Sequence, residues 1–131
     1  LNFPFVDLDD FLVKMEGLSI PQIFAEKGEA YFREAEKKSL HLTLQKKPLV
    51  LATGGGTPCF FDNLNFIKAR GLSIYLKVPL PILCERLLKD QKEPRPLYRQ
   101  SSEEALHKKL LKTLEVREKY YFQAHLLFLN H

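Results

Sequence analysis

The sequence predicts an α/β fold, with a parallel sheet between layers of helices in a three-layer arrangement. Short apolar runs alternate along the chain with longer segments of helical spacing, a pattern typical of such folds. Residues 49–52 are continuously apolar, as in a strand that is covered on both faces. With 131 residues, 45% of them hydrophobic, the chain fits a single domain over residues 1–131.

The amino-terminal segment predicts a strand followed by a helix. Residues 3–6 are aromatic and β-branched and lead into Asp7, which suits a buried strand that delivers a carboxylate at its end. We expect Asp9 to cap a helix that continues to about Gly17.

A long helical region interrupted by glycine is predicted for residues 19–45. Ser19 has the position of an N-cap, and Pro21 that of an early helical proline. Beyond Gly28, apolar side chains recur at helical spacing up to residue 44. The apolar strand at residues 49–52 then runs into three consecutive glycines.

The second half of the chain continues the alternation of helices and strands. The pattern predicts a helix at residues 60–69 closed by Gly71, a strand at 72–78, a helix at 81–89, a charged loop at 90–100, a long helix from Ser101 or Ser102 to about Phe122, and a short strand at 125–129. Because ligands gather beyond the carboxyl ends of parallel strands, Asp7, Asp9 and the glycines are expected to share one crevice.

Composition restricts the classes of partner. The net charge of +4 favours anionic ligands, but acidic residues are mixed among the basic ones, so we expect no nucleic-acid partner. Cys59 and Cys84 are too few for a disulfide framework, and no cysteine and histidine cluster predicts a zinc site. No apolar run is long enough to cross a bilayer, so we expect a cytoplasmic protein without a membrane partner.

Two aspartates at a predicted strand end form the first candidate site. Asp7 and Asp9 lie one residue apart, so one carboxylate can face a metal and the other an acceptor hydroxyl. The alternative is that Asp9 or Asp10 only caps the following helix.

The glycine triplet and an arginine with its glutamate form the second candidate. Gly54, Gly55 and Gly56 leave the backbone open to a ligand, although a turn with positive φ would also explain one or two of them. Arg33 and Glu36 lie three residues apart on one predicted helix, where they can pair and fix the guanidinium beside Phe32. The alternative is an ordinary surface ion pair.

Two further arginines are weaker candidates. Arg95 lies between two prolines in the loop at residues 90–100, which could close as a lid over a triphosphate, or could carry arginine for solubility alone. Arg117, late in the last predicted helix, reads by itself as a solvated residue that pairs with Glu115 or Glu118.

Together, these segments resemble the shikimate kinase family in their order and spacing. The resemblance rests on Phe5-Val6-Asp7-Leu8-Asp9, Ser19-Ile20 with Ile23-Phe24, Gly28-Glu29 with Phe32-Arg33 and Glu36, Ala52-Thr53-Gly54-Gly55-Gly56, Arg95-Pro96-Leu97, and Arg117 with Tyr120 and Ala124. It implies a P-loop kinase of the nucleoside-monophosphate-kinase type. Such an enzyme moves the γ-phosphoryl group of ATP to the 3-hydroxyl of shikimate with Mg²⁺, on the route to chorismate and the aromatic amino acids.

The resemblance also implies a role for each matched residue. Asp7 would help to hold Mg²⁺, Asp9 would orient the ring hydroxyls and accept the proton, and Arg95 would cover the phosphates. The shikimate carboxylate would be bound by Arg33 and Arg117, with Arg33 fixed by Glu36. The ring would be approached by Gly54, Gly55 and Gly56, and the pocket would be walled by Phe24 and Phe32. Residues 19–45 would form the shikimate-binding region and residues 90–100 the lid.

One departure from the family concerns the phosphate loop. No G-x-x-x-x-G-K-[ST] motif occurs in the sequence, and family members have a strand, this loop and a helix before the segment that matches residues 5–9. We therefore expect these residues to be a portion of a longer polypeptide, with a fold incomplete at the amino terminus and no activity of the portion alone. The alternative is a shikimate-binding pseudokinase without a nucleotide site. We expect a monomer in either case.

Overall fold

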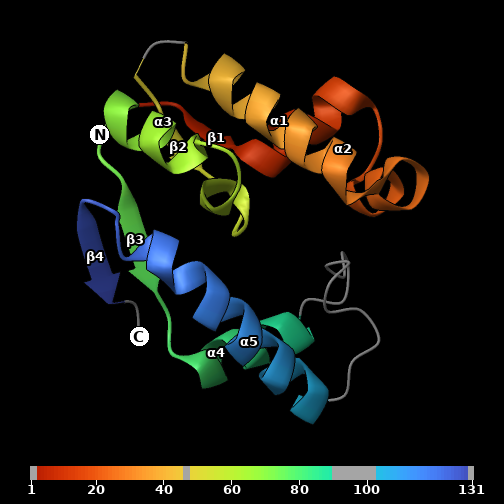
Figure 1. Cartoon of the computed structure of the whole chain (residues 1–131), viewed down its shortest axis with the longest axis vertical. Coiled ribbons are helices and arrows are strands. Elements are labelled where there is room, and N and C mark those ends of the chain that lie inside the picture. Colours follow the sequence, from red (N-terminus) through yellow and green to blue (C-terminus); the bar gives the residue numbers. More distant parts are fainter. Residues whose placement is uncertain (1–2, 46–47, 90–102, 130–131) are drawn as a thin grey trace. The chain divides into compact units, whose positions relative to one another are not determined.

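The computed structural model describes residues 3–45, 48–89 and 103–129. They fall into two compact units, residues 1–70 and residues 71–131, and each unit combines helices with one pair of parallel strands (Figure 1). The predicted α/β class with parallel strands is confirmed, because both strand pairs are parallel.

The first unit is built on strands β1 (Phe5–Asp7) and β2 (Val50–Ala52). They pair in parallel with Asp7 opposite Ala52, so Asp7 and the glycine triplet both follow the same edge of the sheet. The expected burial of the first strand is wrong for Phe5, whose side chain is 66% exposed. The physical reason is that only two strands pair here among the described residues, which leaves little to cover Phe5.

Helix α1 (Leu8–Glu16) is capped by Asp7, and the prediction that Asp9 caps it is wrong. The Asp7 side chain accepts a hydrogen bond from the Asp10 backbone N–H at 3.2 Å. Because β1 runs directly into α1, the last strand residue is also the N-cap, and Asp9 falls in the first helical turn. The helix ends at Gly17, which has a φ of 71°.

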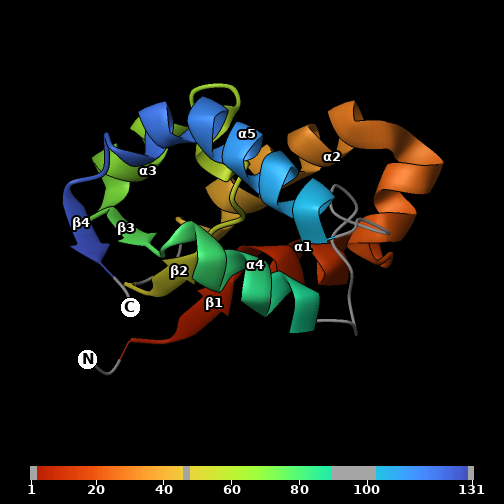
Figure 2. The ribbon, with the colours of Figure 1, turned by 90° about the horizontal axis from the view of Figure 1, so that it is seen from below.

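Helix α2 (Ile20–Thr43) confirms the predicted long helical region with a glycine interruption. Ser19 caps it in a reciprocal pair of hydrogen bonds with Gln22, which satisfies two amides at the helix start. Gly28 has φ 86° and ψ 170°, and the helix bends there (Figure 2). The first half of α2 brings Ile23 and the second half Phe32 into one buried cluster with Leu12 of α1.

The chain leaves β2 through the glycine triplet and a short 3₁₀ helix, η1 (Thr57–Cys59), before helix α3 (Asn63–Arg70). The predicted helix at residues 60–69 therefore starts three residues late. Phe61 explains the delay, because its φ of 51° is incompatible with a right-handed helix.

The second unit pairs β3 (Ile74–Lys77) in parallel with β4 (Leu126–Leu129). Helices α4 (Leu80–Lys89) and α5 (Glu103–Tyr121) lie side by side and bury three side chains between them: Cys84, Leu106 and Leu110 (Figures 1 and 2). The predicted lid at residues 90–100 and the cap at Ser101 or Ser102 lie outside the described residues. In the described part of the chain, no helix has the length and apolar character of a membrane span.

Candidate functional site

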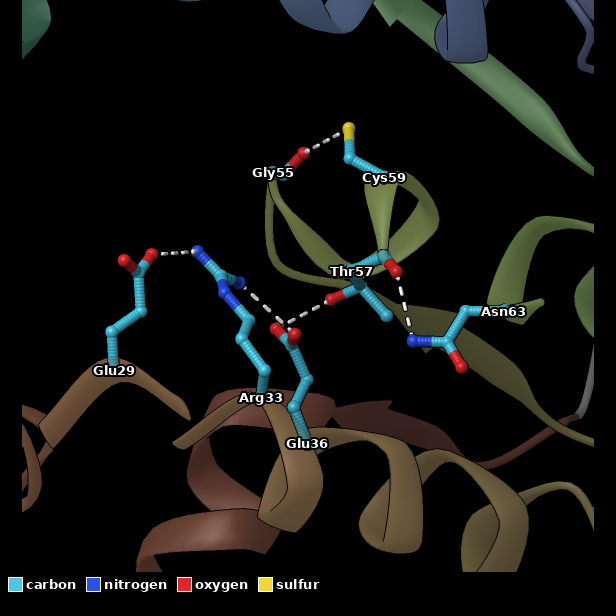
Figure 3. A network of polar contacts seen from close by, with 7 residues as sticks. All are labelled: Glu29, Arg33, Glu36, Gly55, Thr57, Cys59 and Asn63. Carbon is cyan, nitrogen blue, oxygen red and sulfur yellow. Dashed lines mark hydrogen bonds and ion pairs between the residues drawn. The ribbon is translucent and has the colours of Figure 1, made fainter. Parts of the chain in front are cut away.

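Arg33 is the centre of a buried polar network in the first unit (Figure 3). Arg33 is 7% exposed, and its Nη1 lies 3.0 Å from Oε1 of Glu36. This contact is the ion pair that the sequence suggested. Its Nη2 lies 3.5 Å from Oε2 of Glu29, whose side chain is 55% exposed. The Nε–H is buried without a hydrogen-bond partner among the described residues. The Arg33 guanidinium is therefore fixed on one side and more loosely engaged on the other.

Glu36 is a buried carboxylate with two different partners. It is 1% exposed, and its Oε2 accepts a hydrogen bond of 2.8 Å from the Thr57 hydroxyl, while Oε1 faces Arg33. The Asn63 side-chain amide donates to the Thr57 carbonyl at 3.0 Å and anchors this residue from α3. Burial of a carboxylate is costly unless it is paired and hydrogen-bonded, and these contacts meet that requirement.

The glycine turn packs directly against the network. A Cβ on Gly56 would lie only 2.5 Å from Arg33 Nη1, and a Cβ on Gly54 would lie 3.2 Å from both Glu36 Oε2 and Thr57 Oγ1. The same Cβ on Gly54 would lie 3.4 Å from Asp9 Oδ1, so the Asp9 carboxylate is also close to the turn. The structure thus brings Asp9, Arg33, Glu36 and the glycines together.

Aromatic rings cover the Arg33 guanidinium. Its Cζ lies 4.2 Å from the ring centre of Phe60 and 5.2 Å from that of Phe32, distances that suit cation–π contacts. Phe32 is 5% exposed and belongs to the hydrophobic core, where its ring centre lies 4.8 Å from that of Phe24. The predicted role of Phe24 and Phe32 as pocket walls stays a prediction.

The predicted role of Asp7 toward a magnesium ion stays a prediction. No cluster of three or more potential metal ligands exists among the described residues. Mg²⁺ typically takes only one or two carboxylates and completes its shell with water and phosphate oxygens, so one carboxylate at a strand end is a suitable donor. Asp7 is half-buried, and its Oδ1 is bound to the Asp10 amide, which holds the carboxylate in a fixed direction.

Arg117 lies in α5, in the second unit, so its expected proximity to Arg33 stays a prediction. No ion pair of Arg117 is found within the described ranges. Glu118, one of the two partners that the sequence suggested, instead accepts hydrogen bonds from Tyr75 at 3.1 Å and from Lys77 at 3.2 Å. Burial and the hydrogen bond to Glu118 raise the pKa of Tyr75 above its usual range. Arg95 lies outside the described residues.

Sequence reasoning missed three members of the network, namely Thr57, Phe60 and Asn63. Thr57 could have been noticed as a hydroxyl directly after the glycine triplet. Its contact with Glu36 joins residues 21 positions apart, however, and no local spacing rule predicts such a pair. Phe60 and Asn63 carry no signal of their own in the sequence.

Comparison with known proteins places the whole chain in one group. The profile described as shikimate kinase matches residues 1–131. The chain is 43% identical over 124 residues to the shikimate kinase of Aquifex aeolicus, which covers 95% of this chain and 70% of that protein. It is 36% identical over 128 residues to the shikimate kinase of Bacteroides thetaiotaomicron, with coverage of 98% and 73%.

Solved structures agree with the sequence matches. The crystal structure of the Bacteroides thetaiotaomicron shikimate kinase has a TM-score of 0.91 and 35% identity, and covers 97% of this chain and 72% of that chain. Shikimate kinase from Acinetobacter baumannii in complex with shikimate has a TM-score of 0.90 and 33% identity, with coverage of 98% and 70%. These matches confirm the predicted kinase fold class.

Proposed function

Because this chain belongs to the shikimate kinase family, we propose that it moves the γ-phosphoryl group of ATP to the 3-hydroxyl of shikimate. The observation that carries the proposal is the buried Arg33 guanidinium, already oriented by Glu36 beside the glycine turn and Asp9. An arginine held in this way can recognise a carboxylate without first losing its own conformational freedom.

The free edge of Arg33 supports a docking position for the substrate carboxylate. Glu36 occupies Nη1, whereas Nε and Nη2 donate along the opposite edge of the planar group. Nε is buried without a partner among the described residues, and Nη2 has only the 3.5 Å contact with Glu29, whose side chain is 55% exposed. Glu29 is half exposed, whereas Glu36 is buried and hydrogen-bonded through both oxygens, so we propose that a bidentate ligand carboxylate displaces Glu29 and leaves Glu36 in place.

Asp9 is the residue that we propose to orient the acceptor hydroxyl. As the 3-hydroxyl oxygen bonds to the γ-phosphorus and the bond to the ADP oxygen breaks, the hydroxyl proton would pass to the Asp9 carboxylate. The nearness of Asp9 Oδ1 to Gly54 supports this role, because it puts the Asp9 carboxylate beside the same turn that packs against Arg33 and Glu36.

Positive charge completes the proposed site. Both substrates are anions and the transition state spreads further negative charge over the transferring oxygens, so cations are needed on several sides. We assign Arg117 to the shikimate carboxylate, Arg95 to the phosphates within a lid at residues 90–100, and Asp7 to Mg²⁺. When bound, Mg²⁺ would neutralise charge on the phosphate oxygens. We further propose a cytoplasmic monomer that acts on the route to chorismate.

The test is ADP formation by the full-length gene product with shikimate and Mg²⁺ supplied or withheld. We expect activity only when both are present. Removing one partner of a buried charge pair costs on the order of 3 kcal/mol, so Arg33→Ala should raise the KM for shikimate roughly a hundredfold and leave the KM for ATP nearly unchanged. Arg33→Lys, which keeps the charge but loses the fork, should give an intermediate value.

Arg70→Ala is the matched control, because it removes an exposed arginine at the end of α3 that stacks on Phe66. It should leave both KM values unchanged. Phosphorylation of unrelated alcohols without any response to shikimate would contradict the proposal. Calorimetry that shows shikimate binding to the full-length product, together with absence of ATP binding, would instead identify the pseudokinase.

A further inference from the structure

We propose that Thr57 is a positioning residue for the acid-binding arginine, acting through Glu36. The inference rests on the proposed function, since it concerns how Arg33 is aimed at the shikimate carboxylate. Thr57 itself is fully buried at 0% exposure and makes no contact with a ligand in this role.

Three hydrogen bonds hold Thr57 in one position. Its backbone N–H donates to the Gly54 carbonyl at 3.2 Å, its hydroxyl donates to Glu36 Oε2 at 2.8 Å, and its carbonyl accepts from the Asn63 amide at 3.0 Å. Thr57 therefore joins the glycine turn, helix α2 and helix α3 at one point, as Figure 3 shows. A buried residue with its backbone and side chain both engaged has little freedom to shift.

The Thr57 hydroxyl does not serve the local secondary structure. The short helix η1 that begins at Thr57 has Gly56 as its N-cap and no side-chain capping bond. Among the described residues, this hydroxyl donates to the Glu36 carboxylate, 21 residues away in the sequence. The side chain at position 57 is therefore best explained by what it does to Glu36.

Thr57 affects Arg33 because the Glu36 carboxylate has two oxygens, one for each of these residues. While Thr57 holds Oε2, Glu36 presents only Oε1 to Arg33 and engages only Nη1. Without the hydroxyl, Oε2 loses this donor, and the carboxylate can turn to engage Nη1 and Nη2 as a fork, which is the preferred geometry of such pairs. Glu36 would then occupy Nη2, which the proposed substrate carboxylate needs.

The experiment compares steady-state kinetics of four full-length forms: wild type, Thr57→Val, Thr57→Ser and Thr43→Val. Thr57→Val removes the hydroxyl at nearly constant volume, and Thr57→Ser keeps it. Thr43→Val is the matched control, because Thr43 is also buried, at 1% exposure, in the same unit and donates to the Leu40 carbonyl. Thermal unfolding of each form gives its stability.

We expect Thr57→Val to raise the KM for shikimate about tenfold, with kcat and the KM for ATP within about twofold of wild type. Thr57→Ser should keep the wild-type KM for shikimate. Thr43→Val should lower the unfolding temperature but leave the KM for shikimate unchanged. A KM for shikimate in Thr57→Val that equals the wild-type value overturns the inference, as does an equal rise in Thr43→Val.

Two further outcomes remain decisive. If Thr57→Val does not fold, Thr57→Ala removes the same hydroxyl and takes its place in the comparison. If the wild type itself forms no ADP in response to shikimate, the proposed function fails and this inference with it, whereas a responsive wild type with an unaffected Thr57→Val rejects the inference alone.

Discussion

Two glycines of the turn after β2, Gly54 and Gly56, lie where a side chain would have little room. Gly56 has a φ of −89°, a value that any residue adopts, yet it is buried against the Arg33 guanidinium. Gly54 faces Glu36 and Thr57 less tightly, because an added Cβ would lie 3.2 Å from each of them. The sequence predicts glycines that admit a ligand, and the structure shows that at these two positions they first admit the protein's own polar side chains.

Gly56→Ala should therefore weaken shikimate use through Arg33. The new methyl group would lie 2.5 Å from Nη1, so the guanidinium must move away from its position beside Glu36. We expect the KM for shikimate to rise about tenfold or more, with nucleotide affinity retained, since pre-organised charge contacts depend strongly on position.

Gly71→Ala is the control for that variant, because a Cβ at Gly71 meets no other part of the described chain within 4 Å. Steady-state kinetics on both variants check the prediction. Equal KM values for shikimate in the two would show that the close approach of Gly56 does not matter for binding.

Local spacing explains which site residues could be predicted from the sequence. Arg33 and Glu36 are one helical turn apart, so their pairing follows from helix geometry alone. Thr57 and Phe60 reach Arg33 and Glu36 only because β2 pairs with β1 and returns the chain to α2. Such contacts depend on tertiary structure, which a single sequence specifies but does not display in its spacing.

At the scale of elements, helix α2 depends on the backbone freedom of Gly28. Its φ of 86° and ψ of 170° lie in a region that is essentially restricted to glycine. The bend lets the segments on both sides of Gly28 contribute to one core cluster, Ile23 from the first and Phe32 from the second.

Gly28→Ala should destabilise the protein by about 1–3 kcal/mol through backbone strain alone. Apart from neighbouring backbone, no atom of the described residues lies within 4 Å of the added Cβ, so we expect no steric contribution. Thermal and denaturant unfolding measure the loss. Gly71→Ala, a glycine without a positive φ, should unfold like the wild type, and an unchanged midpoint in Gly28→Ala would contradict the strain argument.

Tyr75 links β3 to α5 in the second unit and makes this unit sensitive to alkaline pH. Burial first, and then the hydrogen bond to Glu118, raise the pKa of Tyr75 above the unfolded value of about 10. The stabilisation is complete below that value and is lost as the pH rises through the folded pKa, because the unfolded chain releases its proton first.

Alkaline titration of phenolate absorbance should therefore show one tyrosine that ionises late, and Tyr75→Phe should remove this component. The unfolding temperature of Tyr75→Phe should also fall less steeply than that of the wild type above about pH 10. Tyr31→Phe, which removes an exposed phenol in the first unit, is the control. A late component that persists in Tyr75→Phe would contradict the assignment.

Element boundaries were predictable where a capping signal is local. Ser19 and Pro21 mark the start of α2, and α1 ends at Gly17 as expected. The sequence predicts the wrong N-cap for α1, because Asp7 is both the last residue of β1 and the N-cap. Strand and helix patterns, each considered alone, do not reveal such a shared residue. The start of α3 was misplaced because the positive φ of Phe61 has no signature in the sequence.

At the scale of the whole molecule, the proposal assigns Arg33 and Arg117 to one substrate carboxylate. Shikimate with its carboxylate esterified should be a poor substrate for the wild type, with a KM raised roughly a hundredfold, because an ester cannot form charge-assisted pairs. In Arg33→Ala and in Arg117→Ala, the KM values for the acid and for the ester should differ far less than in the wild type.

Arg70→Ala should discriminate as the wild type does, since it removes charge without touching the network. Kinetics with both substrates check all four forms. If Arg117→Ala keeps the full preference for the acid, Arg117 does not contact the carboxylate, and the role assigned to it from the family resemblance is wrong.

The hydrogen bonds of Thr57 also determine where the first unit can flex. Relative motion between the glycine turn and the second half of α2 would break the bond from Thr57 to Glu36, and a shift of α3 would break the bond from Asn63. Thr57 therefore ties the glycine turn, α2 and α3 together at one point. Ile23, on the other side of the Gly28 interruption, packs with Phe32 in one buried cluster, so the first part of α2 is joined to these segments by core packing as well.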